Sequence, residues 1–251
     1  MTDGLAWLLD PNHWQGPDGV PVRIFEHLAI SIPSVLTAAA IALPAGIAIG
    51  HSGRGATLAV NLANIGRAVP SYAVMVIVLP ISIRWNPDLG LDVVPTVTAM
   101  ILLAIPPILV NTYAGIRSVE PDAVEAARAM GMRERDIVAR VELPLALPVI
   151  VGGFRTATVQ VIATATLGAI VAYGGLGRYL IDGIARNEDG RLFAGVILVA
   201  ALALGAEAGL ALAQRAITPA GVRRAVGAER GGGAPRGPDA RRTAGERGPD
   251  L

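Results

Sequence analysis

Glu125-Ala126-Ala127-Arg128-Ala129-Met130-Gly131, followed after nine intervening residues by Val141-Glu142-Leu143-Pro144, forms a charged segment between two long apolar stretches. Its alanines and Met130 recur at helical spacing, and Pro121 suits a first helical turn. Gly131 can take the positive φ that ends a helix, and Met132 to Val141 is expected to form a second helical run, which Pro144 closes. The segment therefore predicts a helix, a bend and a second helix.

The composition of the whole chain indicates an integral membrane protein. Of 251 residues, 53% are hydrophobic and only 16% are charged, which is too apolar for an average soluble domain. The net charge of +1 gives no indication of a nucleic-acid partner. Cysteine is absent, so the sequence contains neither a disulfide framework nor a thiolate site.

We predict an all-α fold with five transmembrane helices, because crossing the bilayer takes about 20 mostly apolar residues. Arg67 and Pro70 interrupt the second of these helices, so six spans are the alternative. The five predicted spans are Leu28–Gly50, Thr57–Ile83, Val93–Tyr113, Leu145–Tyr173 and Leu192–Ala213.

Arginines near the span ends predict the orientation, because cytoplasmic loops are enriched in basic residues. This places the charged segment and the C-terminus in the cytoplasm and the N-terminus outside. We expect an extracytoplasmic segment at 1–26, a transmembrane domain at 27–217 with its loop at 118–144, and a disordered cytoplasmic tail at 218–251. The arginines of the predicted cytoplasmic side are Arg54, Arg117, Arg128, Arg133, Arg135, Arg140, Arg215, Arg223 and Arg224; those of the other side are Arg23, Arg84, Arg178 and Arg186.

The spacing of Glu-Ala-Ala, Gly and Leu-Pro resembles the EAA loop of ABC importer permeases, with Val141 where that family usually has Ile. The resemblance implies a type I importer fold in the cell membrane and a cytoplasmic coupling loop that contacts an ATP-binding subunit. The alternative is that the segment is an ordinary amphipathic connector between membrane helices. The coupling residues that the resemblance implies are Glu125, Ala126, Ala127, Met130, Gly131, Leu143 and Pro144.

All 21 basic residues are arginine, so the chain has no P-loop, whose lysine reaches the phosphates. We therefore expect a transport subunit rather than an enzyme, with no bound cofactor, and with ATP and Mg held by a partner. An intramembrane enzyme is the alternative from another class. His13, His27 and His51 lie at or outside the predicted helix ends, where solvated or interfacial side chains are the default interpretation.

An ion-coupled secondary carrier is a further alternative, since such carriers use ionisable groups buried near the bilayer midplane. The candidates here are Arg67, Arg155 and Glu207. A structural ion pair or an interfacial anchor is the competing interpretation of these residues.

The resemblance extends over about residues 20 to 217, and its osmoprotectant branch imports glycine betaine, carnitine, choline or proline betaine. Methionine or another amino acid is the alternative solute. Arg67 and Tyr72 depart from residues common in that branch. The segments that resemble it are Asn64–Tyr72, Ile105–Ile116, Val141–Pro148 and Gly174–Gly177.

Quaternary ammonium groups are usually recognised by several aromatic faces. Away from the ends of the predicted spans, the only aromatic residues are Tyr72 and Phe154. We therefore expect selectivity to reside in a separate extracytoplasmic binding protein. From the resemblance we also expect a second permease subunit, identical or homologous, in the same lipid bilayer, and two ATP-binding subunits that dock on the permeases from the cytoplasm.

Thr156, Gln160 and Thr164 form a polar stripe on the fourth predicted span. Gln160 and Thr164, with Tyr72, are our candidates for the translocation path, and close packing between helices is the alternative role of the stripe. Gly174, Gly175 and Gly177 are candidates for an outer gate at the end of that span. A plain helix terminator explains these glycines equally well.

Overall fold

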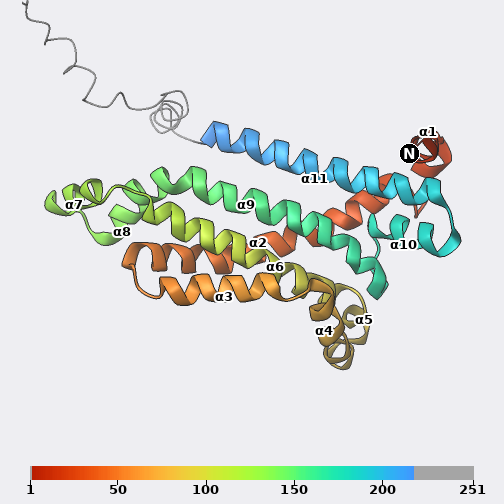
Figure 1. Ribbon diagram of the computed structural model, residues 1–251, viewed down its shortest axis with the longest axis horizontal. Coiled ribbons are helices and arrows are strands. Elements are labelled where there is room, and N and C mark those ends of the chain that lie inside the picture. The colour runs from red at the N-terminus through yellow and green to blue at the C-terminus, as the bar shows by residue number, and fades with distance from the viewer. Residues whose placement is uncertain (1, 218–251) are drawn as a thin grey trace, which may run out of the picture. The chain divides into compact units, whose positions relative to one another are not determined.

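The computed structural model describes residues 2–217, except for the side chains of Thr2, Leu58, Ala59, Leu62, Ile65 and Arg67. Within this range, the regular elements are all helices (Figure 1). The tail predicted at 218–251 lies outside the described residues.

Four helices are long and apolar enough to cross a membrane. They correspond to four of the five predicted spans, and each extends beyond the predicted limits at one end or at both. The first begins at Val20 rather than Leu28, because Gly19 is extended and Pro21 fits the first turn. The four are α2 (Val20–Ser52), α6 (Val93–Arg117), α9 (Leu143–Ala165) within a helical run over Glu134–Val171, and α11 (Asp189–Ile217).

The remaining predicted span, Thr57–Ile83, is not one helix. Helix α3 (Ala56–Ala68) ends before Pro70, and α4 (Ser71–Trp85) begins after it. Proline disfavours the helical conformation of the preceding residue, and Val69 is accordingly extended, with φ of −77° and ψ of 121°. The division corresponds to the six-span alternative, while the number of helices that cross the bilayer stays a prediction.

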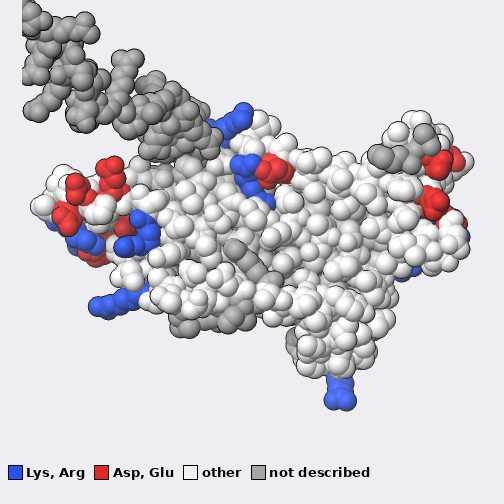
Figure 2. Space-filling view, viewed as in Figure 1, with Lys and Arg blue, Asp and Glu red and all other residues white. Residues whose placement is uncertain are grey.

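Apart from α3 and α4, the shorter elements lie toward the two ends of the long helices (Figure 1). Charged side chains gather at these ends, and most of the surface between them is uncharged (Figure 2). The first end holds α7 (Pro121–Ala129), α8 (Glu134–Ile137) and the π-helical turn η2 (Val138–Glu142). The other end holds α1 (Thr2–Leu9), η1 (Pro11–Trp14), α5 (Pro87–Gly90), the 3₁₀ helix η3 (Thr166–Val171) and α10 (Gly177–Arg186).

Helices α2, α6 and α9 form the core, and small residues let them approach closely. A Cβ atom added at Gly46 or Gly50 of α2 would lie 2.7 Å from the Cβ of Thr112 or Ile116 of α6. Lipid is as apolar as a leucine side chain, so membrane helices associate through such close contacts. The buried core residues are Ile30, Val35, Ala38, Ala39, Ala42, Met100, Ala104, Ile108, Ala157, Val161 and Ala165.

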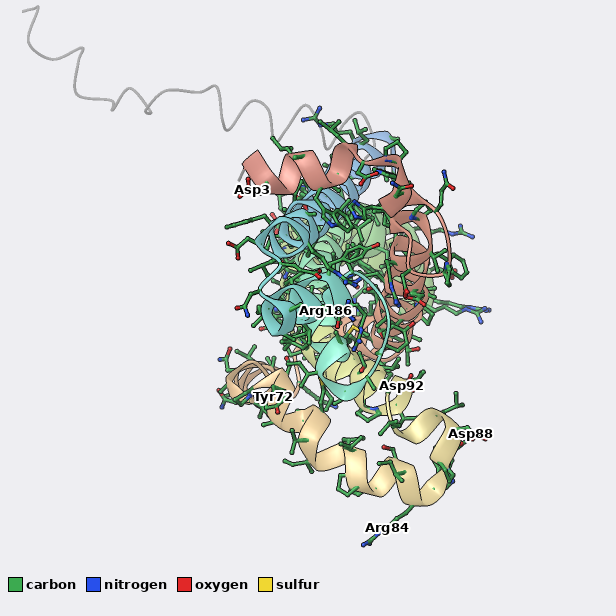
Figure 3. The ribbon with its side chains drawn as sticks, turned by 90° about the vertical axis from the view of Figure 1, so that its right-hand side faces the viewer. Asp3, Tyr72, Arg84, Asp88, Asp92 and Arg186 are labelled. Atoms are coloured by element: carbon green, nitrogen blue, oxygen red, sulfur yellow. The ribbon has the colours of Figure 1, made fainter. Side chains whose placement is uncertain are left out.

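Helices α4 and α5 form an arm that extends away from the bundle, with Arg84 pointing outward (Figure 3). A groove of about 650 Å³ lies between α2, α3, α4 and α6. Apolar side chains such as Val74, Leu102 and Leu103 line it.

Two neighbouring glycines of α9 test the importance of close packing. In Gly153→Ala the new Cβ would lie 2.7 Å from the Cβ of Asn111 and 2.8 Å from the carbonyl oxygen of Pro107, so we expect destabilisation by about 1–3 kcal/mol. The matched Gly152→Ala has no atom within 4 Å and should be neutral or stabilising by up to about 1 kcal/mol. Thermal unfolding of the detergent-purified chain measures both, and equal effects would contradict this packing.

Candidate functional site

The charged segment that the sequence singles out lies between α6 and α9. Helix α7 ends at Ala129, and Gly131 has a φ of +81°, which reverses the chain before α8 begins at Glu134. The N–H of Met132 donates to the carbonyl of Ala127 (3.2 Å), and the N–H of Gly131 donates to that of Arg128 (2.9 Å). These bonds satisfy carbonyls at the end of α7 and fix the bend.

Two groups can be distinguished among the predicted coupling residues. Ala127 is buried and packs inside the loop, whereas Glu125, Ala126 and Gly131 are exposed. Met130 is 75% exposed although it is apolar. Leu143 and Pro144 are half-buried at the start of α9. The loop therefore presents an outward face that combines one carboxylate with alanine and methionine side chains.

Pro144 does not close the second helix, contrary to the prediction. Helix α8 continues through the π-turn η2 into α9, and the N–H of Leu143 bonds to the carbonyl of Val138, five residues earlier. Proline in a regular helix interior would lack a donor and clash with the carbonyl four residues before it. The wider π-turn directly precedes Pro144, which then occupies the first turn of α9. The second half of the loop, from Glu134 onward, and α9 thus form one continuous helical run.

His51, in the last turn of α2, contacts this loop. Its Nδ1 lies 2.8 Å from a carboxylate oxygen of Glu142, and its Nε2 lies 3.1 Å from one of Glu134. Glu134 also accepts two hydrogen bonds from Arg128 of α7, at 2.9 and 3.1 Å. Glu142 is only 5% exposed, so losing its partner would leave a buried carboxylate unpaired, which typically costs on the order of 3 kcal/mol.

Helix α9 and helix α11 enclose a groove of about 490 Å³. Arg155 forms an ion pair with Glu207 and donates to the side-chain oxygen of Gln214 (2.8 Å). This agrees with the structural ion pair that was one interpretation of the two charges. Thr156 and Gln160 line the groove beside the pair.

The three candidates for the translocation path do not converge within this chain. Gln160 lies in the groove between α9 and α11, and Thr164, half-buried on α9, is not among its lining residues. Tyr72 is 48% exposed at the start of α4, on the arm (Figure 3).

The glycine cluster lies against the start of α2. The helical run ends at Ala172, before the glycines, and the φ of 69° at Ala172 is rare for a residue other than glycine. The interpretation of these glycines as the terminator of the helix is therefore wrong. Gly175 has a φ of +76°, and its N–H donates to a carboxylate oxygen of Glu26 (2.7 Å). A Cβ at Gly177 would lie 2.2 Å from the carbonyl oxygen of Thr166, so this position requires glycine.

The prediction that His27 lies at or outside a helix end is wrong. His27 lies within α2, and its side chain is completely buried. Its Nε2 lies 2.9 Å from the carbonyl oxygen of Ile162 on α9. The contacts of His27 and His51 join residues 135 and 91 positions apart, so local sequence patterns could not reveal them.

Comparison with known proteins identifies the family. The family described as binding-protein-dependent transport system inner membrane component matches residues 24–219, which is most of the chain. The chain belongs to this family. It is therefore a transport component, as expected, and among residues 2–217 no group of three or more His, Asp or Glu side chains could hold a metal ion.

Several characterised permeases are similar to this one over nearly their full length. The choline transport system permease protein OpuBB of Bacillus subtilis (strain 168) is 35% identical over 202 residues, covering 80% of this chain and 90% of that protein. The carnitine transport permease protein OpuCB of Listeria monocytogenes is 33% identical over 204 residues, covering 81% of this chain and 90% of that protein.

A solved structure has the same fold as this permease. A chain of the MetNI methionine ABC transporter in an inward-facing conformation superposes with a TM-score of 0.68. The match covers 78% of this chain and 94% of that chain, at 24% sequence identity. This likeness shows the helical fold of an ABC importer permease.

Proposed function

We propose that this permease is the membrane-spanning subunit of an ATP-driven importer for quaternary ammonium osmoprotectants such as glycine betaine, carnitine or choline. The observation that carries the solute class is the similarity to OpuBB and OpuCB, whose names give choline and carnitine as their solutes. The similarity covers 90% of each relative, so it involves the whole transmembrane unit rather than a shared fragment.

The permease works with a separate extracytoplasmic binding protein that supplies the selectivity. Among residues 2–217 the close aromatic ring pairs are Trp7 with His13 and Trp7 with Tyr179, all at the α1 and α10 end. Tyr72 lies on the α4 arm and Phe154 packs in the core. No aromatic cage for a quaternary ammonium group is formed by these described residues, so tight binding of glycine betaine to the purified permease alone would contradict this part of the proposal.

Segment 118–144 is the cytoplasmic coupling loop that contacts an ATP-binding subunit. The exposed Glu125, Ala126, Met130 and Gly131 supply a contact face, while the half-buried Leu143 and Pro144 join it to α9. Because the helical run from Glu134 to Val171 is continuous, a displacement of the loop moves α9 with it. ATP and Mg are held by the partner, and two permease subunits pair with two ATP-binding subunits.

In the membrane, α7 and α8 face the cytoplasm and α1 and α10 face outward. The arginine distribution supports this orientation. The polar stripe with Gln160 and Thr164, together with Tyr72, contributes to the path between two permease subunits. The outer gate includes Gly174, Gly175 and Gly177. Glu26 of α2 accepts a hydrogen bond from the N–H of Gly175 and so holds this glycine segment against α2.

Uptake of labelled solutes tests the proposed function. In cells that lack this chain and other osmoprotectant importers, restoring it together with its partners should restore uptake of glycine betaine, carnitine or choline, but not of methionine. Substituting the P-loop lysine of the ATP-binding partner should abolish that uptake, since the permease has no such site. Restored methionine uptake alone, or uptake that persists with the disabled partner, would contradict the proposal.

Replacing Gln160 with Leu tests the path. The substitution removes a polar group from the groove without adding a charge, so the chain should insert and assemble normally. Uptake should fall several-fold, because polar side chains inside a membrane commonly line the path of the solute. Leu204→Ala, which changes an apolar residue of the same groove, serves as the control. Unchanged uptake in Gln160→Leu would assign the stripe to helix packing instead.

A further inference from the structure

Two opposite charges meet between the apolar helices α9 and α11, away from the ends of both. Arg155 is the only charged residue of α9, and it follows the start of that helix by twelve residues, or about 18 Å. Glu207 is the only charged residue of α11 outside its first and last turns, and it precedes the end of that helix by ten residues, or about 15 Å. A group of opposite charges is visible midway along the otherwise uncharged surface (Figure 2).

The depth and exposure of this pair indicate that it does not face lipid. The side chains of Arg155 and Glu207 are 31% and 36% exposed. Charged side chains inside a membrane are costly, and they almost always face the bundle interior or a water-filled cavity. Both residues line the groove between α9 and α11, whose volume of about 490 Å³ is in the usual range for small-molecule sites. We therefore expect the groove to be wetted in the assembled importer.

The ion pair leaves part of its hydrogen-bonding capacity unused. Arg155 donates from Nε and Nη2 to a single oxygen of Glu207, Oε1, and from Nη1 to Gln214. A guanidinium has five N–H donors, so two remain. Within residues 2–217, the other carboxylate oxygen of Glu207 accepts no hydrogen bond, and the side-chain amide of Gln160 in the same groove makes none.

These free groups match the two charges of a zwitterion. A solute that lies antiparallel to the pair brings its carboxylate to the remaining N–H groups of Arg155 and its quaternary ammonium group to the free oxygen of Glu207. Glycine betaine and carnitine carry both charged groups, whereas choline carries the ammonium group and a hydroxyl. Among the described residues no aromatic side chain lines the groove, so the ammonium group is held by charge without an aromatic cage. Such weak binding suits a solute in passage.

We propose that the groove between α9 and α11 is a passage site for zwitterionic solutes, in which Arg155 binds the carboxylate and Glu207 binds the quaternary ammonium group. This inference rests on the proposed function. The binding protein determines which solutes reach the permease, and the groove determines how readily each of them passes. Gln160 supplies a further polar group, which can donate to a carboxylate or accept from a hydroxyl.

Initial rates of uptake of labelled glycine betaine and choline test the site, in cells that hold the complete importer and no other osmoprotectant importer. Arg155→Gln removes the carboxylate partner, so the ratio of glycine betaine uptake to choline uptake should fall about tenfold relative to the wild type. Arg155→Lys keeps a positive charge and should recover most of that ratio. The matched Arg178→Gln removes an arginine that is 32% exposed and paired with Asp182 outside the groove, and it should keep the wild-type ratio.

The double variant Arg155→Gln with Glu207→Gln separates a solute site from a purely structural ion pair. It leaves no unpaired charge within the membrane, so the complex should assemble like the wild type. Uptake of both solutes should fall because the ammonium group loses Glu207, and uptake of glycine betaine should fall further because its carboxylate loses Arg155. A purely structural pair would leave the uptake ratio unchanged.

Protection of an introduced cysteine tests occupancy of the groove directly. The chain contains no cysteine, and Thr156 is an exposed residue of the groove. In the assembled complex, Thr156→Cys should react with a water-soluble thiol reagent, and saturating glycine betaine should slow the reaction several-fold. Combining it with Arg155→Gln should remove this protection.

An uptake ratio that stays at the wild-type value in Arg155→Gln and in the double variant would overturn the passage site, as would a Thr156→Cys that does not react or is not protected. Wild-type transport of choline but of neither zwitterion would also overturn it, while the proposed function would stand. Where the wild type carries glycine betaine but no choline, the protection assay decides. Failure to transport any of the three solutes would overturn the proposed function itself.

Discussion

Close packing of α2, α6 and α9 through small residues is the constraint on which the rest of the structure depends. Gly46 and Gly50 bring α2 against α6, and Gly153 brings α9 against the same helix, at separations that a single added methyl would disturb. In lipid the apolar surface of a helix gains little by leaving the solvent, so the contact itself must provide the association energy. The remaining elements take their positions from these three helices.

Helices α2 and α9 are also joined by polar contacts at both ends. At one end His51 contacts Glu142, which directly precedes α9. At the other end Glu26 accepts from Gly175, and Tyr173 donates to the carbonyl of Glu26 at 3.0 Å. Such long-range polar contacts define a register between two helices that apolar packing alone leaves less well specified. In an importer, this arrangement would let α2 and α9 respond together to a force on the loop.

The sequence predicts the helical membrane class and most of the long helices, because their apolar runs are a local property of the chain. The break at Pro70 could be foreseen as an alternative, since proline acts on its nearest neighbours. The continuation past Pro144 could not be foreseen, because a π-turn resolves the clash that a regular helix would suffer. His27 and His51 find partners on other helices, and Ala172 takes a φ normally left to glycine, so these features follow from the tertiary structure.

The central claim is that segment 118–144 is held by an ATP-binding subunit in the cytoplasm. The chain contains no cysteine, so single cysteines can be introduced without altering a natural one. Met130 and Trp85 are both largely exposed, at 75% and 82%. Met130 follows α7, whereas Trp85 ends α4 on the arm, which lies apart from α7 (Figure 1). In membranes that contain the assembled complex, Met130→Cys should cross-link to the ATP-binding subunit and Trp85→Cys should not. Cross-linking from Trp85→Cys and none from Met130→Cys would contradict the account.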